Sequence, residues 1–265
     1  MSSQYLVDIQ EERLSFFTPA GEVKALNNVT LQMREGEVLG IVGESGSGKS
    51  VTAYSIMGLT AQNGKIVGGS VEFNGHKIHE MSEKELRKIR GNEVSIIFQD
   101  PMTSLNPVWT VGNQIAEAVS LHTDKKGRAA MERAKELLEL VGINEPEKRL
   151  KQYPHELSGG QLQRVCIARA IALEPKIILF DEAISSLDAH TQVQVMDLLK
   201  DLQEKFSFSY FFITHDLSSI SYFCHRVLFL YQGEIVENLE VDKLHKVQHP
   251  YGKKLLHSIV ELKEE

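Results

Sequence analysis

The stretch GESGSGKS, residues 43–50, constrains the fold more than any other part of the chain. It has the spacing G-x-x-x-x-G-K-[ST] and lies between the apolar run EVLGIVG and the helix-like segment KSVTAYSIMGL. A strand that passes through such a turn into a helix points backbone N–H groups at one place, where they can bind a phosphate chain. Lys49 would reach the β- and γ-phosphates, and Ser50 would supply a hydroxyl ligand for Mg²⁺. The predicted nucleotide-binding residues are Gly43, Glu44, Ser45, Gly46, Ser47, Gly48, Lys49 and Ser50.

Strand-like and helix-like segments alternate along the chain, which favours an α/β fold. Short apolar runs predict buried strands in VSIIF, KIILFDE and SYFFIT, and RVLFLYQGEIVE is typical of a hairpin with its turn at Gln232-Gly233. From about residue 111 to 173 the spacing is helical throughout, which predicts a helical insertion in the α/β core. The stretch HPYGKKLLHSIV predicts an amphipathic helix with Pro250 in its first turn.

Composition excludes several classes of protein. The net charge of the 265 residues is −7, whereas a nucleic-acid-binding domain is more often basic. Cys166 and Cys224 lie in segments that predict buried helices, so we expect two buried thiols rather than a disulfide framework or a metal cluster. We see no apolar run of about 18 residues and no signal peptide, and we expect a cytoplasmic location.

A second glycine-rich helix start occurs in HELSGGQLQR, residues 155–164. Ser158 can cap the helix, and the two glycines after it expose backbone N–H groups. The start of a helix carries a partial positive charge of roughly +0.5, so this segment is also suited to an anion.

Polar side chains follow three of the predicted core strands. Asp181 ends the strand KIILFD and is placed to hold Mg²⁺, and Glu182 beside it is placed to accept a proton from an attacking water. His215 ends the strand SYFFIT and could hydrogen-bond the γ-phosphate, whereas Gln99 after VSIIF could reach the Mg²⁺ or the water. The predicted catalytic residues are Glu182, His215 and Gln99, and the predicted metal ligands are Ser50, Gln99 and Asp181.

These motifs and their order resemble those of the ATP-binding-cassette (ABC) ATPases. The resemblance implies a P-loop NTPase (RecA-like) core, an N-terminal antiparallel β-subdomain and an inserted α-helical subdomain. It implies ATP and Mg²⁺ as cofactors and a head-to-tail dimer in which the LSGGQ of one subunit closes over the nucleotide of the other. It places Asp188 at the dimer seam, although Asp188 can also be an N-cap. The residues that would serve the partner's nucleotide are Ser158, Gly159, Gly160 and Gln161.

The family also implies an aromatic side chain that stacks on adenine. Strand alternation in LSFFTP puts Leu14 and Phe16 on one face and Phe17 on the other. We expect Phe16 to stack on the base and Phe17 to lie in the core.

Two further segments resemble one branch of the family. FQDPMTSLNP, residues 98–107, and HPYGKKLL, residues 249–256, are similar to segments of the peptide and nickel importer ATPases. The resemblance implies an ATPase subunit that powers peptide uptake at the cytoplasmic face of the membrane. Its partners would be a second ABC ATPase subunit (a paralogue or itself), two membrane permease subunits and, indirectly, a solute-binding protein. This chain has no cysteines for the iron–sulfur extension of many such members, and Ala183 replaces a frequent proline.

Alternatives remain at this point. The solute could be nickel or a metallophore, since the ATPase does not touch it. A non-transport ABC ATPase and a P-loop kinase are remoter alternatives. A kinase would leave the LSGGQ segment unexplained. We expect one ABC domain over residues 1–265, with the α/β core and β-subdomain in about 1–98 and 174–240, the helical subdomain in about 99–173 and a C-terminal element in about 241–265.

The segment QDPMTSLNPVWTVG is the predicted link to the permease. Its two prolines and asparagine predict a stiff loop, and it carries the chain's one tryptophan, Trp109. If this loop docks, a cysteine at Ser104 should crosslink to a cytoplasmic loop of the permease.

Overall fold

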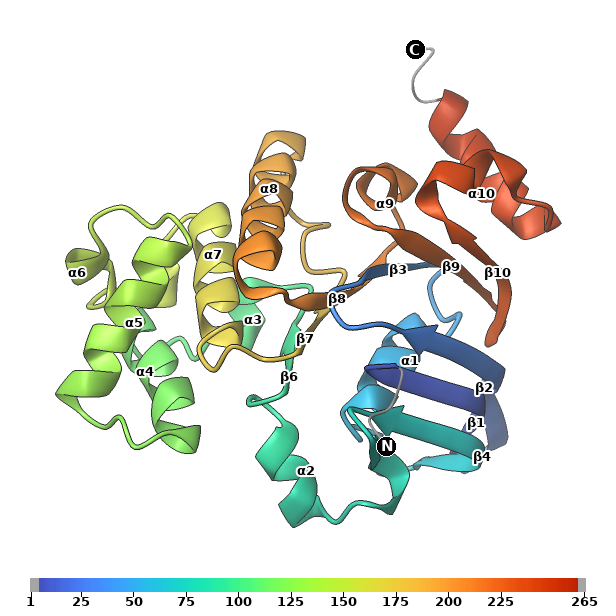
Figure 1. Cartoon of the computed structure of the whole chain (residues 1–265), viewed down its shortest axis with the longest axis horizontal. Coiled ribbons are helices and arrows are strands. Elements are labelled where there is room, and N and C mark those ends of the chain that lie inside the picture. Colours follow the sequence, from blue (N-terminus) through green and yellow to red (C-terminus); the bar gives the residue numbers. More distant parts are fainter. Residues whose placement is uncertain (1–4, 262–265) are drawn as a thin grey trace. The chain divides into compact units, whose positions relative to one another are not determined.

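The computed structural model describes residues 5–261, which belong to two compact units (Figure 1). The first unit holds the chain up to Leu86 and again from Ser209 onward, and the second holds Arg87–Phe208. Strands and helices alternate through the chain, as the sequence predicts. Within residues 5–261, each helix is too short or too polar to cross a membrane.

An antiparallel sheet forms the N-terminal part of the first unit, in the strand order β2-β1-β4-β5. This sheet is the expected β-subdomain. Apolar side chains of β1, such as Val7, Ile9 and Leu14, are fully buried. The register of β1 against β2 shifts three times between Ile9 and Ser15, so strict alternation of buried and exposed residues is lost. The strands are β1 (Val7–Thr18), β2 (Gly21–Met33), β4 (Gly64–Phe73) and β5 (His76–Lys77).

Parallel strands form the core of the first unit. The central strand, β3, pairs with β8 on one side and β9 on the other, and every residue of β3 is buried. Burial on both faces explains its unbroken apolar sequence. The hairpin between β9 and β10 turns at Gln232 and Gly233, both with positive φ (49° and 81°), as in a type I′ turn. The strands are β3 (Val38–Val42), β8 (Ser209–Thr214), β9 (Arg226–Tyr231) and β10 (Glu234–Glu240).

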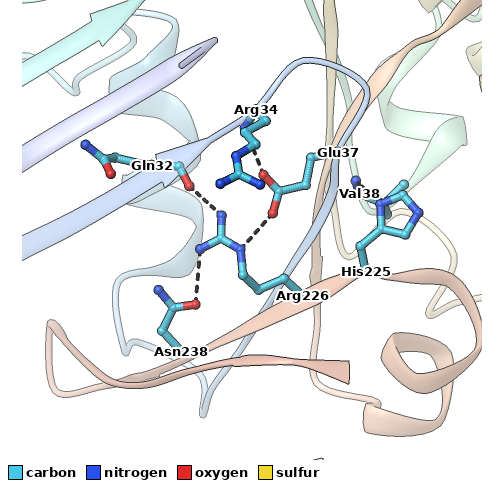
Figure 2. A network of polar contacts seen from close by, with 7 residues as sticks. All are labelled: Gln32, Arg34, Glu37, Val38, His225, Arg226 and Asn238. Atoms are coloured by element: carbon cyan, nitrogen blue, oxygen red, sulfur yellow. Dashed lines mark hydrogen bonds and ion pairs between the residues drawn. The ribbon is translucent and has the colours of Figure 1, made fainter. Parts of the chain in front are cut away.

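A polar network joins the N-terminal end of β3 to its neighbours (Figure 2). Arg226 donates from Nε to Glu37 at 2.7 Å, from Nη1 to Asn238 at 3.1 Å, and from Nη2 to the carbonyl of Gln32. The backbone N–H of Val38 donates to His225 Nδ1 at 3.1 Å. The network therefore fixes β2, β9 and β10 around the start of β3, whereas the glycine-rich loop follows its other end.

Short helices complete the first unit. Ser82 and Glu85 form a capping box, because the Ser82 N–H donates to the Glu85 carboxylate at 2.8 Å and the Glu85 N–H donates to Ser82 Oγ at 3.4 Å. Pro250 begins α10, as predicted. The elements are α1 (Lys49–Ile56), η1 (Ile78–Glu80), α2 (Glu83–Ile89, which continues into the second unit), α9 (Leu217–Phe223), η3 (Val241–Lys246) and α10 (Pro250–Glu261).

The second unit has two parallel strands and a group of helices. The strands β6 (Val94–Ile97) and β7 (Ile177–Asp181) pair directly. Between them every described element is helical, and the apolar side chains of α5 that the spacing predicts to be buried are so, including Ala134 and Leu137. The helices are α3 (Pro101–Ser104), α4 (Val111–His122), α5 (Arg128–Leu140), α6 (Pro146–Arg149), η2 (Pro154–Glu156), α7 (Gly159–Ala170) and α8 (Ala189–Phe206).

One local prediction in this unit is wrong. Residues 101–104 form the helical turn α3 instead of part of a stiff loop. The Asp100 side chain accepts from the N–H of Met102 at 2.9 Å, and Pro101 occupies the first helical position, where a proline is favourable. The thiols of Cys166 and Cys224 are buried as predicted, although Cys224 follows α9 instead of lying within it.

Candidate nucleotide-binding site

The glycine-rich loop connects β3 to α1 in a conformation that only glycine allows at several positions. Gly46 and Gly48 have φ of 79° and 106°. A Cβ on Gly48 would lie 2.7 Å from Leu26 Cδ2, and one on Gly43 would lie 2.3 Å from the carbonyl oxygen of Leu230. The loop is therefore closely backed by β2 and by the β9–β10 hairpin, whose Gly233 N–H donates to the Ser47 carbonyl at 3.0 Å.

The lysine of the motif lies over this loop. Lys49 is buried, and its Nζ donates to the carbonyls of Gly43 and Glu44 at 2.8 and 2.9 Å. The hydroxyl of Ser47 is buried and has no hydrogen-bond partner. A buried cation beside an unpartnered hydroxyl and a turn of backbone amides suits a phosphate chain, because the ligand would satisfy these donors. The residues of the loop thus fit the nucleotide that the sequence predicts.

The acidic pair lies in the second unit, at the end of β7. Asp181 is buried, and the Glu182 backbone is left-handed with φ of 51°. Such a conformation costs about 1–2 kcal/mol in a residue other than glycine, and strained residues of this kind are found at active sites as well as in turns. Gln99 Nε2 donates to Glu182 Oε2 at 3.3 Å, so the structure brings these two predicted residues together. The left-handed backbone leaves no signal in the sequence.

The second helix start also lies in this unit. The Ser158 side chain accepts from the N–H of Gln161 at 3.4 Å, and the Gln161 side chain accepts from the N–H of Ser158 at 3.0 Å, which is a capping box. The sequence predicts the cap at Ser158, and the S-x-x-Q spacing is a signal for the return bond to Gln161 that was not used. A Cβ on Gly160 would lie 2.9 Å from Thr191 Cγ2 of α8, whereas one on Gly159 would meet only Leu187 Cδ2, at an ordinary contact distance of 4.0 Å. Ser158 and Gly159 are exposed.

Asp188 is the N-cap of α8, as predicted. Its carboxylate accepts from the N–H and the hydroxyl of Thr191, at 3.0 and 2.6 Å. The bond from the Thr191 hydroxyl, together with backbone N–H bonds, lowers the pKa of this carboxyl below its ordinary value. Asp188 is therefore ionised at neutral pH, and its role at a dimer seam stays a prediction.

His215 follows β8 in the first unit and is exposed. The next residue, Asp216, accepts from the N–H groups of Ser218 and Ser219 at 2.9 and 3.0 Å and so caps α9. This aspartate was not among the predicted residues, although an Asp directly before a helical segment is an N-cap signal. The cap fixes the backbone immediately after His215.

The expectation for the aromatic pair is wrong in one respect. Phe17 is 45% exposed, so it is not a core residue. Phe16 is half-buried, and a Cβ on Gly64 would lie 2.9 Å from its ring, which shows how closely β4 passes. The register shift between Leu14 and Ser15 breaks the alternation on which the expectation depended.

Comparisons with known proteins agree on one family. The ABC transporter family profile matches residues 26–185. A probable peptide ABC transporter ATP-binding protein of Sinorhizobium fredii is 46% identical over 256 residues, covering 96% of this chain and 76% of the relative. An oligopeptide transport ATP-binding protein of Escherichia coli is 44% identical over 261 residues, covering 98% and 77%. A dimeric ATP-binding cassette in a post-hydrolysis state, bound to ADP and Pi, superposes with a TM-score of 0.79 at 32% identity, covering 89% of this chain and 98% of that one.

The family match includes the glycine-rich loop, Gln99, the helix start at Ser158 and the acidic pair after β7. Asp188 and His215 lie beyond the matched residues, within the span of the near-full-length relatives. The glycine-rich loop suits a phosphate chain, and the second helix start has the LSGGQ sequence of the family. Because the profile and the relatives cover both, the chain belongs to the ABC transporter family and is one of its ATP-binding, ATP-hydrolysing cassettes.

Proposed function

We propose that this chain is the ATPase subunit of an importer that takes up peptides through a separate membrane permease. The observation that carries the proposal is its similarity, over 96–98% of its length, to proteins named as peptide, dipeptide or oligopeptide transport ATP-binding proteins. The protein would work at the cytoplasmic face of the cell membrane. Its partners would be two permease subunits, a second ATPase subunit and, indirectly, an extracytoplasmic solute-binding protein.

The chemistry would be hydrolysis of the γ-phosphate of ATP. Lys49 would hold the β- and γ-phosphates, and the oxygens of Ser50, Gln99 and Asp181 are the kind of ligand that Mg²⁺ prefers. Bound Mg²⁺ would neutralise charge on the phosphate oxygens. Glu182 would take the proton of the attacking water, and its hydrogen bond from Gln99 supports this role by orienting the carboxylate.

His215 would hydrogen-bond the γ-phosphate, and Phe16 would stack on the adenine. The exposure of Phe17 makes it the competing candidate for the base. The affinities of Phe16→Ala and Phe17→Ala for ATP and for inorganic triphosphate would separate the two candidates. Loss of the stacking residue should weaken the binding of ATP and leave the binding of triphosphate, which has no base, unchanged.

A complete site would need a second subunit. Ser158, Gly159, Gly160 and Gln161 would meet the nucleotide that is bound to the partner, with Asp188 at the seam. The exposed start of α7 supports this assignment, since it is accessible to a ligand that this chain does not itself hold.

The surface around α3 is the proposed contact with the permease. Phe98, Met102, Val108 and Trp109 are all at least 40% exposed, and Val108 is 75% exposed. Clustered exposed apolar side chains typically mark an interaction site, here one for a short cytoplasmic helix. Ser104 is half-buried, and its hydroxyl donates to the Pro101 carbonyl at 3.1 Å, so Val108→Cys is a better crosslinking variant than Ser104→Cys.

The proposal is tested by uptake of a labelled tripeptide in cells that depend on this chain. Lys49→Ala should abolish uptake, and Lys84→Ala, which removes an exposed lysine from α2, should not. Uptake that persists with Lys49→Ala would refute the motor role. Loss of nickel uptake with unchanged peptide uptake would reassign the solute.

A further inference from the structure

The C-terminal HPYG segment contacts the glycine-rich loop directly. The backbone N–H of Glu44, the second residue of GESGSGKS, donates to the hydroxyl of Tyr251 at 2.6 Å. Tyr251 is buried, and its ring packs against that of Tyr231 with 4.5 Å between centroids. The two partners of this hydrogen bond are 207 residues apart in the chain.

The same peptide group also holds the lysine of the motif. The carbonyl of Gly43 and the N–H of Glu44 belong to one planar unit, whose two ends point in opposite directions. The carbonyl accepts from Lys49 Nζ at 2.8 Å, and the N–H donates to Tyr251. Any rotation of this peptide that displaces Lys49 must therefore also break the bond to the tyrosine.

The segment around Tyr251 is itself firmly placed. The Glu237 carboxylate of β10 accepts from the N–H groups of Gln248 and His249, at 2.7 and 2.5 Å. A Cβ on Gly252 would lie 2.5 Å from Val247 Cγ1 and 3.5 Å from the ring of Phe229, so only glycine lets α10 pack this closely. The H-P-Y-G sequence thus fixes the tyrosine against the loop.

We propose that Tyr251 is a positioning residue for nucleotide binding, which holds the Gly43–Glu44 peptide and, through it, the Lys49 ammonium in the geometry that receives the β- and γ-phosphates. The inference rests on the proposed function, since it assigns a role in ATP binding to a residue outside the loop. Tyr251 touches no nucleotide in this role.

The test compares Tyr251→Phe with Tyr231→Phe. The first removes the hydroxyl and keeps the ring that packs on Tyr231. The matched control removes the hydroxyl of that neighbouring ring, which accepts from Gln232 Nε2 at 3.2 Å. Tyr251→Phe should weaken the affinity for ATP by about 3- to 10-fold, as expected for one hydrogen bond, and leave the affinity for AMP unchanged. Tyr231→Phe should alter neither affinity, and both variants should stay folded, because the loss of one hydrogen bond lowers the melting temperature by only about 2–4 °C.

Unchanged ATP affinity in Tyr251→Phe would overturn the inference, and so would an equal loss for ATP and AMP, which would indicate a general packing defect. A second measurement is independent of nucleotide: hydrogen exchange of the Glu44 amide should be slow in the full chain and at least several-fold faster in Tyr251→Phe. Equal exchange rates would also overturn it. A wild-type chain that binds no ATP would instead refute the proposed function.

Discussion

Two helices of this chain, α1 and α7, begin at glycine-rich turns, yet their first turns are built differently. The N-cap of α1 is Gly48, with φ of 106° and no side chain to accept a hydrogen bond. The N-cap of α7 is Ser158, which forms a reciprocal capping box with Gln161. The start of α1 is buried and carries the buried Lys49, whereas the start of α7 is exposed and has no basic residue in its first turn.

The difference bears on the proposal that the start of α1 binds ATP and the start of α7 completes the site of a partner. A helix terminus alone contributes about 0.3–1 kcal/mol to an anion at an exposed position. At α1 this contribution is combined with a lysine, a wrapped loop and an unpartnered Ser47 hydroxyl. At α7 the chain supplies its own cap, so the helix is stable without a ligand and remains available to a nucleotide that is held elsewhere.

The largest expected effect concerns the step that would need both helix starts. Glu182→Gln should lower ATP turnover by about 10²–10⁴-fold, as for the loss of a general base, and should leave ATP binding intact. With hydrolysis blocked, ATP should trap a dimer, which size-exclusion chromatography would detect. Glu204→Gln, at an exposed position of α8, is the matched control. Wild-type turnover in Glu182→Gln would remove Glu182 from this role.

Mixing two inactive variants tests whether one ATP site uses α1 of one subunit and α7 of the other. Lys49→Ala damages the α1 site and Ser158→Arg damages the α7 site, so neither homodimer should turn over ATP. A mixed dimer would contain one site with both lesions and one with neither. With equal mixing, half of the dimers are mixed, and each mixed dimer has one intact site out of two. Mixing should therefore restore about a quarter of wild-type activity if the sites are independent.

The control for this experiment mixes two separately prepared Lys49→Ala samples, which should stay inactive. Absence of rescue, when labelled subunits demonstrably exchange, would contradict a shared site. If the natural dimer contains a paralogue, the two lesions must be placed in different partners.

Helix α1 also contacts a buried carboxylate of β1. Ser55 of α1 donates to Glu12 Oε2 at 3.2 Å, and Glu12 Oε1 is buried without a partner. Burial raises the pKa of this carboxyl to about 8, and the bond from Ser55 only partly opposes the rise. The folded state therefore keeps a proton that the unfolded state loses above about pH 4.5. This contribution to stability is fully present below that pH and is lost as the pH rises toward 8.

Glu12→Gln should accordingly flatten the pH dependence of unfolding and stabilise the protein at pH 8.5 relative to wild type by about 1–3 kcal/mol. Urea unfolding at pH 5, 7 and 8.5 measures the difference. Glu11→Gln, at the exposed neighbouring position, should keep the wild-type slope. An unchanged slope in Glu12→Gln would show that Glu12 does not hold the proton.

Glu12 and Phe17 also mark where sequence reasoning fails. The loop at residues 43–50 and the strand before it depend on local chemistry, and both are found as predicted. In β1 the alternation rule assumes an unbroken register. Glu11 has φ of 49°, and a Cβ on Gly69 would lie 2.3 Å from its carbonyl, so the bulge depends on a contact with a strand that is distant in sequence.

The contact between Tyr251 and Glu44 is inaccessible to sequence reasoning for a similar reason. The sequence identifies a helix at Pro250 and a phosphate loop at Gly43, but not that β9 and β10 carry the first against the second. The order of the motifs in the sequence led to the resemblance to a family. The physical role of the C-terminal segment becomes visible only in the structure, where Gly252 packs on Phe229.

The smallest expected effect tests why α7 needs its two glycines. Neither has a positive φ, in contrast to Gly48, so conformational freedom does not explain them. Gly159→Ala should stabilise the protein by about 0.5–1 kcal/mol, since alanine restricts the unfolded chain and its Cβ would make only an ordinary contact with Leu187 Cδ2 at 4.0 Å. Gly160→Ala should be about 1 kcal/mol less stable than Gly159→Ala, because its Cβ would meet Thr191 Cγ2 at 2.9 Å.

Urea unfolding of both variants measures this difference, and Thr191→Ser provides the decisive control. Serine lacks the methyl group but can keep the hydroxyl bond to Asp188, so it should recover most of the loss in Gly160→Ala and change little in Gly159→Ala. Equal stabilities of the two alanine variants would mean that α8 yields to the added methyl group. In that case we would expect the partner's nucleotide to require Gly160 instead, because backbone amides must approach a phosphate closely, and a loss of ATP turnover without a loss of stability would support that role.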